Sequence, residues 1–277
     1  MSRAAKEGKK LKIALCFFGT VGKTSLDNEA VRISISRFLE LNKKTLFYTE
    51  VDVFAHCWGN EIDRREIISL LKPKSVLVEP AEHLETRTFS VHRMFYFGIK
   101  EGLSILRRVF LRTAFRQNQI LYDYRLHSRW LSVYKSISLL KAYENTMNVK
   151  YDVVMSLRYD ISFYNKFPYE QIVEKKLYAG NWNNLPREEN SYELDFVNMY
   201  KGEGFIDLWF AGTSEVMTKF SKLYFKLDKL PVSQHFASGQ YWKCYMSKDV
   251  DVEYILYRWI DFELIRSKED KILPPHI

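Results

Sequence analysis

Short apolar runs alternate with amphipathic segments through the first half of the chain. The run Leu11–Phe18 (LKIALCFF) predicts a buried strand, and Gly19 at its end predicts a turn. The same pattern predicts a helix, a strand, a helix and a strand in turn, at residues 29–41, 46–54, 61–71 and 75–78. Pro73 cannot continue a helix and is expected to end the predicted helix 61–71. Alternating strands and helices are typical of βαβ units that build a mainly parallel sheet.

The second half of the chain has a less regular pattern. Residues 92–148 contain no proline and show mainly helical spacing, so two or more helices are expected there. Residues 151–157 (YDVVMSL) predict a strand, and Arg158-Tyr159-Asp160 follows at its carboxyl end. Further strands are predicted at 177–179, 206–211 and 252–257, and further helices at 214–227 and 238–246. We therefore expect an α/β fold with a Rossmann-type, mainly parallel sheet flanked by helices and a mixed C-terminal half.

Charge favours an anionic partner. The chain has 277 residues, with 42 Lys and Arg against 34 Asp and Glu, which gives a formal net charge of +8. That balance suits a nucleoside diphosphate, a lipid headgroup or a nucleic acid. No basic block is long enough to act as a nucleic-acid arm, so no nucleic-acid partner is expected.

The cysteines indicate a reducing compartment. Cys16, Cys57 and Cys244 have neither the spacing of a metal site nor that of a disulfide framework. Cys16 and Cys57 lie inside apolar runs, where a buried, reduced thiol is the usual state. The N-terminus lacks the apolar core of a signal peptide, and no segment reaches transmembrane length. A cytoplasmic enzyme is the expectation.

The turn after the first strand contains Gly19 and continues to Gly22-Lys23-Thr24. A glycine turn at this place can bring backbone amides close to phosphate groups, and Lys23 adds positive charge. The last three positions fit the P-loop pattern G-x-x-x-x-G-K-[ST], but Phe17 stands where its first glycine is required. A phosphate-binding loop and a plain strand-to-helix turn both remain open.

Asp160 stands at the end of the predicted strand 151–157. A carboxylate there can bind a divalent cation that bridges a diphosphate, and Mg²⁺ or Mn²⁺ suits oxygen ligands. The leaving group of a nucleotide-sugar is a nucleoside diphosphate, whose growing charge must be neutralised by a metal or by cationic side chains. The alternative is that Asp160 caps a turn or pairs with Arg158.

Several segments, in matching order, resemble the bacterial and large-virus glycosyltransferases with a GT-A-like nucleotide-sugar fold. They are ALCFFG at 14–19, DVFAHCW at 52–58, SRWLSVYKSISLLKAYE at 128–144 and YDVVMSLRYDISF at 151–163. The segment DLWFAG at 207–212 and the helix that follows it resemble a later strand and helix of the same family. The resemblance extends from about Leu11 to Met217, and the order of the motifs carries it.

The resemblance implies transfer of a sugar from a nucleoside-diphosphate sugar to a hydroxyl of a glycan or lipid-linked acceptor, as in polysaccharide biosynthesis. The residues that it places at the nucleotide-sugar are Gly19, Lys23, Arg129, Ser132, Lys135, Arg158 and Asp160. Arg158-Tyr159-Asp160 resembles the family's DxD metal motif with Arg in place of the first Asp. Asp160 is then the expected ligand of Mn²⁺ or Mg²⁺, and Arg158 can itself neutralise phosphate.

The resemblance also suggests how the chain is organised. We expect residues 1–10 to be a basic lead-in and residues 11–277 to form one glycosyltransferase domain. Within it, 11–160 would be the nucleotide-binding half and 161–277 the acceptor-side half.

An inverting transferase needs a base that deprotonates the acceptor hydroxyl. Asp207 is the first candidate, although a structural role at a strand end is equally open, and Glu203 and Glu215 are rivals. Trp209 could present an apolar face to a sugar ring. His235 is expected either near the diphosphate or at the start of a helix.

Two other functions remain open. A phosphotransferase or sulfotransferase would use Gly22-Lys23-Thr24 as a P-loop. A non-catalytic module, or a transferase in peripheral contact with a membrane, would bind an anionic surface through a predicted helix that carries Arg107, Arg108, Arg112 and Arg116.

Overall fold

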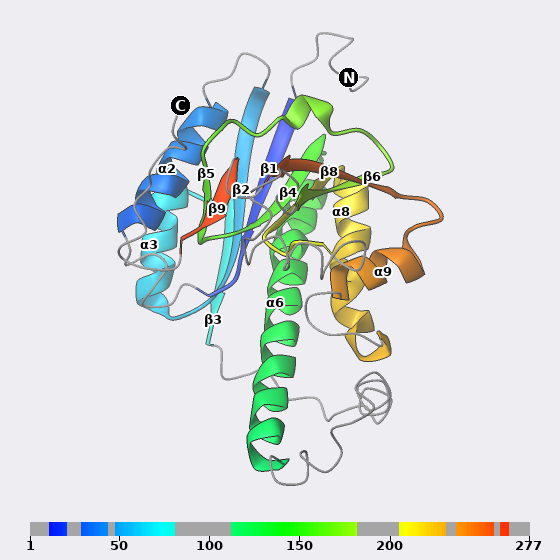
Figure 1. The fold of residues 1–277 in the computed structure, drawn as a ribbon. Coiled ribbons are helices and arrows are strands. Elements are labelled where there is room, and N and C mark those ends of the chain that lie inside the picture. The colour runs from blue at the N-terminus through cyan, green and yellow to red at the C-terminus, as the bar shows by residue number, and fades with distance from the viewer. Residues whose placement is uncertain are drawn as a thin grey trace, which may run out of the picture.

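The chain folds around one large sheet with helices on both faces (Figure 1). The structure is a computed structural model that describes residues 11–20, 29–43, 48–80, 112–181, 205–230, 237–257 and 261–265. Its seven-stranded sheet has the order β3-β2-β1-β4-β7-β6-β8, and a second sheet has two strands, β5 and β9.

The elements of the described residues have the following bounds. The helices are α2 (Glu29–Lys43), α3 (Glu61–Leu71), α6 (Arg112–Met147), α8 (Ser214–Ser221) and α9 (Ala237–Tyr245), with 3-10 helices η2 (Tyr169–Gln171) and η3 (Lys222–Lys229). The large sheet contains β1 (Leu11–Phe18), β2 (Tyr48–Trp58), β3 (Ser75–Glu79), β4 (Val153–Arg158), β6 (Lys176–Asn181), β7 (Trp209–Gly212) and β8 (Asp251–Tyr257). The small sheet pairs β5 (Ile161–Phe163) with β9 (Phe262–Leu264).

The large sheet is mainly parallel, with one reversed strand. β1 is parallel to β2 and β4, β2 is parallel to β3, and β6 is parallel to β8. β7 runs antiparallel to both of its neighbours, β4 and β6. The expected α/β class, with a mainly parallel sheet and a mixed second half, is therefore confirmed. β1 lies between β2 and β4, so the strand order reverses there, and ligands of open α/β sheets bind at the carboxyl ends of strands around such a point.

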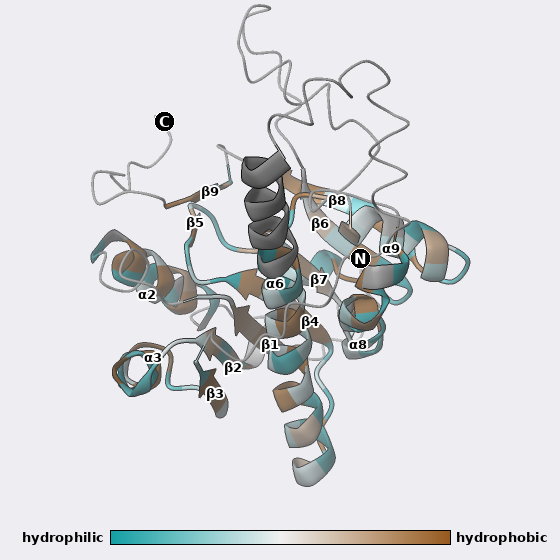
Figure 2. Cartoon of the chain, turned by 90° about the horizontal axis from the view of Figure 1, so that it is seen from below, coloured by the Kyte–Doolittle hydropathy of each residue, from teal (hydrophilic) through white to brown (hydrophobic). Residues whose placement is uncertain are grey.

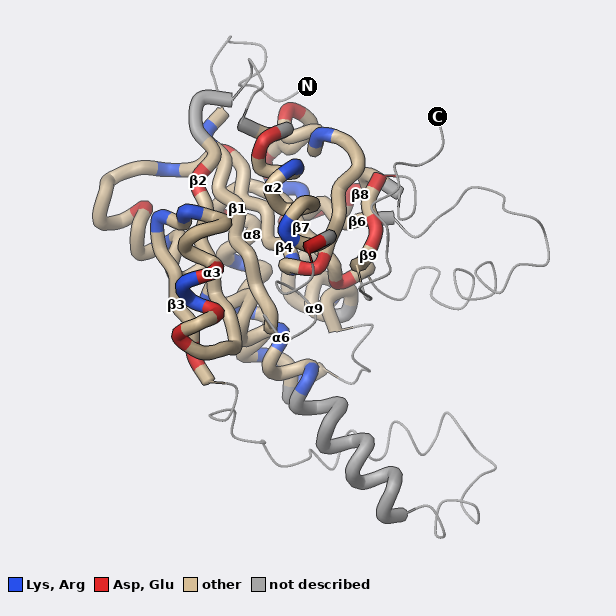
Figure 3. The backbone as a smooth tube through the Cα atoms, turned by 90° about the vertical axis from the view of Figure 1, so that its left-hand side faces the viewer, with Lys and Arg blue, Asp and Glu red and all other residues tan. Residues whose placement is uncertain are grey.

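Alternate residues of the strands face two separate cores. On β1, Ile13, Leu15 and Phe17 pack with α2 and α3, while Ala14, Cys16 and Phe18 pack with α6, α8, η3 and α9. This alternation follows from the two-residue period of a strand. Figure 2 shows the two helical layers on opposite sides of the sheet, with brown, hydrophobic strands between them. Charged residues lie mainly on the outer helices and strand ends, as Figure 3 shows, whereas Lys12 is the sole charged residue of β1.

Helix α6 is a single helix of 36 residues (Figure 1). The described part of the segment 92–148, in which two or more helices are expected, forms this one helix, because no proline interrupts it from Arg112 to Met147. Its buried apolar positions repeat every three or four residues, at Leu126, Trp130, Val133, Ile137 and Leu140. At 1.5 Å per residue the helix is about 54 Å long, so its first turns project beyond the carboxyl edge of the sheet.

Most predicted elements of the described residues are present, and two strands were missed. The predicted helix 214–227 is divided into α8 and the 3-10 helix η3. The strands that the pattern did not predict are β5 and β9, which have three residues each. Strands this short carry too few positions for a two-residue period to stand out.

Two expectations about the whole chain can be compared with the structure. Cys16 and Cys57 are buried free thiols, as expected, and Cys244 is exposed. Among the described residues, no helix is both long enough and apolar enough to cross a membrane.

Burial of α6 against the sheet can be tested at Ile137, which is fully buried. We expect Ile137→Ala to lower the free energy of unfolding by about 2–5 kcal/mol, because it removes apolar contacts and leaves a cavity. The matched control is Ile68→Ala on α3. Ile68 is 41% exposed, so this substitution should lower the free energy of unfolding by less than about 1 kcal/mol. Urea unfolding of both variants measures the difference, and equal costs would show that α6 is not packed as described.

Candidate functional site

The site lies where β1 and β4 end side by side. Phe18, the last residue of β1, pairs in register with Arg158, the last residue of β4. Gly19 follows with a φ of 125°, a conformation that residues with a Cβ rarely adopt, so glycine is needed for this turn. Gly19 and Asp160 therefore lie at the same edge of the sheet, as the sequence analysis requires of a shared binding site.

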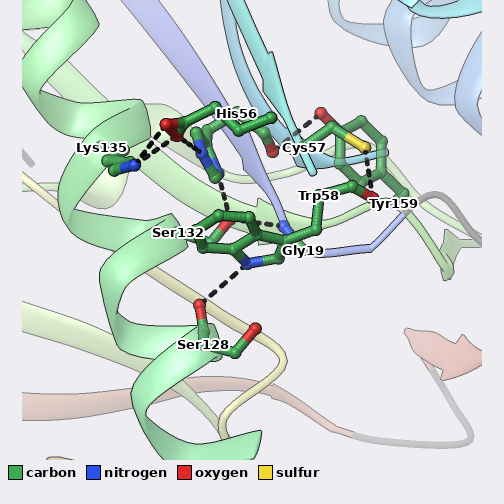
Figure 4. Close-up of polar contacts among 9 residues, drawn as sticks. Gly19, His56, Cys57, Trp58, Ser128, Ser132, Lys135 and Tyr159 are labelled. Carbon is green, nitrogen blue, oxygen red and sulfur yellow. Dashed lines mark hydrogen bonds and ion pairs between the residues drawn. The ribbon is translucent and has the colours of Figure 1, made fainter. Parts of the chain in front are cut away.

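The Gly19 turn is held by helix α6 and strand β2 (Figure 4). The Gly19 amide donates to Ser132 Oγ of α6 at 2.9 Å, and its carbonyl accepts from the amide of Trp58 at 3.0 Å. The indole Nε1 of Trp58 donates to the carbonyl of Ser128 at 3.1 Å. These bonds join the ends of β1 and β2 to the same face of α6.

His56 continues this network from Ser132 to the end of β3. Its Nδ1 lies 2.7 Å from Ser132 Oγ, and its Nε2 lies 3.0 Å from Glu79 Oε1. Burial lowers the pKa of His56 to about 4, although the hydrogen bond to Glu79 acts in the other direction. The imidazole is therefore neutral at pH 7. Because a carboxylate only accepts, Nε2 carries the proton and donates to Glu79, and Nδ1 accepts from the Ser132 hydroxyl.

Lys135 completes what we call the Gly19 network, made of Gly19, His56, Glu79, Ser132 and Lys135. The ammonium group of Lys135 pairs with both oxygens of Glu79, with Nζ 2.8 Å from Oε2, and lies 5.1 Å from the centre of the Trp58 ring. Burial alone would raise the pKa of Glu79, but the hydrogen bonds from Lys135 and His56 outweigh it and lower that pKa. Glu79 is thus an ionised anchor for two side chains.

The Gly19 network changes what Ser132 and Lys135 can do. Both were predicted to face a nucleotide, yet Ser132 is fully buried and its hydroxyl is used between Gly19 and His56. Lys135 is directed to Glu79, which the sequence analysis missed. Glu79 follows the predicted strand 75–78 directly, so its place at the carboxyl edge of the sheet was the signal that could have identified it.

Arg158 and Asp160 form a forked ion pair beside the Gly19 turn. Arg158 donates from Nε to Asp160 Oδ1 at 2.7 Å and from Nη2 to Asp160 Oδ2 at 2.5 Å. The backbone carbonyl of Asp160 accepts from the amide of Ile265 at 2.9 Å, just beyond β9. The small sheet therefore fixes the backbone that carries this carboxylate.

A second ion pair lies next to the first and joins α6 to β7. Arg129 of α6 donates from Nη1 to Asp207 Oδ2. Asp207 stands two residues before β7, and because β7 is reversed, its amino end meets the carboxyl ends of β1 and β4. The carbonyl of Leu208 also accepts from the amide of Arg158 at 3.2 Å, which holds the two segments together.

Arg129, Arg158, Asp160 and Asp207 act on one another electrostatically, and we call them the Arg–Asp quartet. Burial lowers the pKa of Arg129, and the nearby charge of Arg158 lowers it further, while Asp207 opposes both. Burial also acts to lower the pKa of Arg158, but the charges of Asp160 and Asp207 outweigh it and raise that pKa. Two guanidinium groups thus repel each other at a partly buried place, where their side chains are 23% and 27% exposed and an anion that contacts both would be stabilised.

The residues at this edge do not fit a divalent cation. Both carboxylate oxygens of Asp160, the expected metal ligand, accept from Arg158. Within the part of the chain that the structure describes, no three His, Cys, Asp or Glu side chains are grouped to hold a metal ion. Mg²⁺ and Mn²⁺ prefer several oxygen ligands, so neither would be held by these residues as they are arranged.

Two further expectations are corrected by the structure. Trp209 is fully buried among Phe163, Phe167 and Phe262, so its ring does not present a face to a sugar. Glu215 lies in the first turn of α8, which follows the other end of β7 and is therefore at the opposite edge of the sheet from Asp207.

Several candidate residues lie outside the described part of the chain. They are Lys23 with its neighbours Gly22 and Thr24, the rival acid Glu203, His235, and the arginines Arg107 and Arg108. Arg112 and Arg116 belong to the first turns of α6.

Comparison with known proteins gives no relative from which a function could be transferred. No protein-family model matches this chain, and no curated protein matches it either. The function must therefore be inferred from the Gly19 network and the Arg–Asp quartet themselves.

The neutral state of His56 has a consequence for stability. Its pKa is about 4 in the folded chain against an ordinary value of 6.5, so the unfolded chain binds more protons between these two pH values. The free energy of unfolding should therefore fall as the pH is lowered from 6.5 to 4. We expect this contribution to be on the order of 3 kcal/mol, since one pKa unit corresponds to about 1.4 kcal/mol.

Urea unfolding at a series of pH values, for the wild type and His56→Gln, measures that contribution. Carboxylates that do not contact His56 are shared by both proteins and cancel in the difference, and the glutamine amide can still donate to Glu79. The stability gap between the two proteins should shrink towards pH 4, and a gap that stays constant with pH would contradict a buried, neutral His56.

Proposed function

We propose that this chain is a glycosyltransferase that moves a sugar from a nucleoside-diphosphate sugar to a hydroxyl of an acceptor glycan. The observation that carries the proposal is the Arg–Asp quartet. Its members come from α6, the end of β4 and the segment before β7, and they meet at the carboxyl edge of the sheet beside β1. The sequence motifs predict all four as site residues.

The chemistry of the quartet suits a diphosphate. Guanidinium groups present several N–H donors in one plane and bind phosphate oxygens through paired hydrogen bonds. Arg129 and Arg158 would neutralise the charge that grows on the diphosphate as its bond to the sugar breaks. Both side chains are partly buried, which strengthens this stabilisation relative to that in bulk water.

The transfer can be written with the groups at this edge. The acceptor oxygen forms a bond to the anomeric carbon, and the bond from that carbon to the diphosphate oxygen breaks with its electron pair left on the diphosphate. The proton of the acceptor hydroxyl passes to Asp207, the proposed base. The reaction needs no other reactant. Once its bond to the sugar has broken, the nucleoside diphosphate remains bound to Arg129 and Arg158.

The topology supports the proposal as well. The parallel part of the sheet has the order β3-β2-β1-β4, as in dinucleotide-binding folds, and the strand order reverses at β1. A GT-A-like architecture, which the sequence motifs suggest, combines this parallel part with a mixed second half. The Gly19 network supports the site indirectly, because it holds the turn after β1 against α6.

The two other functions have no support from the described residues. A P-loop role depends on Gly22-Lys23-Thr24, and binding to an anionic surface depends on Arg107 and its neighbours. A panel of nucleotides separates the transferase from the phosphotransferase. Preference for UDP or GDP over ATP supports the transferase, whereas preference for ATP that is lost in Lys23→Ala would favour a phosphotransferase.

The role of Asp207 is tested by Asp207→Asn, which keeps the shape of the side chain and one oxygen for Arg129. We expect sugar transfer, or hydrolysis of the preferred donor, to slow by about 10²- to 10⁴-fold, because a general base is lost. Donor binding should persist. A steady-state assay over a panel of UDP-, GDP- and CMP-sugars gives both quantities.

The matched control for this substitution is Asp249→Asn. Asp249 is exposed and pairs with Lys219 at the opposite edge of the sheet from Asp207, so its loss should leave turnover unchanged. If Asp207→Asn retained the turnover of the wild type with an unchanged circular dichroism spectrum, Asp207 would not be the base.

A further inference from the structure

The forked pair between Arg158 and Asp160 bears on how the site would hold its ligand. A metal-dependent site would leave the carboxylate of Asp160 free for a cation. Here each of its two oxygens accepts from a different nitrogen of Arg158, at 2.7 and 2.5 Å. The backbone of Asp160 is fixed in addition by the amide of Ile265. The carboxylate is thus positioned to hold a guanidinium group.

Arg129 and Asp207 form a second ion pair beside the first, joined by one hydrogen bond in place of a fork. Each guanidinium group of the quartet is held by one carboxylate, so its orientation is set before a ligand arrives. A guanidinium group has five N–H donors, and the hydrogen bonds from Arg158 to Asp160 use two of its three nitrogens. Donors on the remaining nitrogen can then contact phosphate while Asp160 stays in place.

A divalent cation at Asp160 would have to displace Arg158 from its partner. That exchange would leave a poorly hydrated guanidinium group without its counter-charge, next to Arg129 and a metal ion of the same sign. The other carboxylate of the quartet, Asp207, is held by Arg129. The described residues therefore offer no group of carboxylate oxygens whose bonds to the cation would offset the loss of the Arg158–Asp160 pair.

We infer that the site binds the diphosphate of its ligand directly through Arg129 and Arg158, without a bridging divalent cation, and that Asp160 is a positioning residue for Arg158. This rests on the proposed function for the identity of the ligand. The inferred contacts involve only the pyrophosphate group of the ligand, so any compound with that group could bind the same two guanidinium groups.

The test is a comparison of ligand affinity with and without a divalent cation. The purified full-length chain is titrated calorimetrically with inorganic pyrophosphate, UDP and GDP, once in excess EDTA and once in MnCl₂. We expect at least one of these probes to bind equally well in both buffers. This measurement needs no variant, so it does not depend on whether a substituted chain folds.

Variants identify the groups that are responsible. Arg158→Gln should weaken binding in EDTA by about tenfold to a hundredfold, as expected for loss of a charge-assisted hydrogen bond. Arg158→Lys keeps the positive charge but lacks the paired donors of a guanidinium group. Its affinity in EDTA should lie between those of Arg158→Gln and the wild type. The matched control is Arg65→Gln on α3, an exposed arginine that contacts the carbonyl of Glu61 and should leave the affinity unchanged.

Asp160→Asn distinguishes a positioning residue from a metal ligand. The ratio of the affinity in MnCl₂ to that in EDTA should stay near one in this variant, as in the wild type. A metal ligand would show a large ratio in the wild type that Asp160→Asn abolishes. That result would overturn the inference and leave the proposed transferase standing.

The other outcomes are equally distinct. Binding in EDTA that depends on Arg158, with no transfer from any nucleotide-sugar, would uphold the inference and refute the proposed function. Failure of all three probes to bind in either buffer would overturn the inference.

Discussion

Two partly buried guanidinium groups that lie close together must each be matched by a negative charge, and this requirement governs the carboxyl edge of the sheet. Arg129 and Arg158 meet it with Asp207 and Asp160. Three features of the fold are needed for the match. Helix α6 must cross this edge, β7 must be reversed so that Asp207 arrives there, and the segment after β9 must fix the backbone of Asp160.

Helix α6 connects this cluster with the rest of the edge. Arg129, Ser132 and Lys135 are three residues apart, so they lie along one side of the helix. They contact the sheet in spatial order, since Arg129 reaches Asp207 before β7, Ser132 reaches Gly19 after β1, and Lys135 reaches Glu79 at the end of β3. The buried bonds of Ser132 thereby set the rotation of α6 that directs Arg129 into the Arg–Asp quartet. The Gly19 network supports the site, although three of its residues, Gly19, Ser132 and Lys135, were expected to contact the nucleotide-sugar themselves.

The sequence predicted the regular part of the fold well, because strands such as Leu11–Phe18 and helices such as Glu61–Leu71 have a clear period. It also selected all four members of the Arg–Asp quartet. The sequence could not predict which residues form ion pairs, because the partners lie far apart along the chain. Arg129 and Asp207 are separated by 78 residues, and Lys135 and Glu79 by 56. For the same reason Trp209 was misjudged: its residue type suits a sugar platform, and only the packing of β9 against it shows that it is buried.

The most direct measurement of the central claim is a crystal structure of the chain grown with the nucleoside diphosphate that binds best. We expect guanidinium nitrogens of both Arg129 and Arg158 within hydrogen-bond distance of phosphate oxygens, with the Gly19 turn alongside. A diphosphate bound elsewhere, with the four members of the Arg–Asp quartet still paired only to one another, would contradict the account.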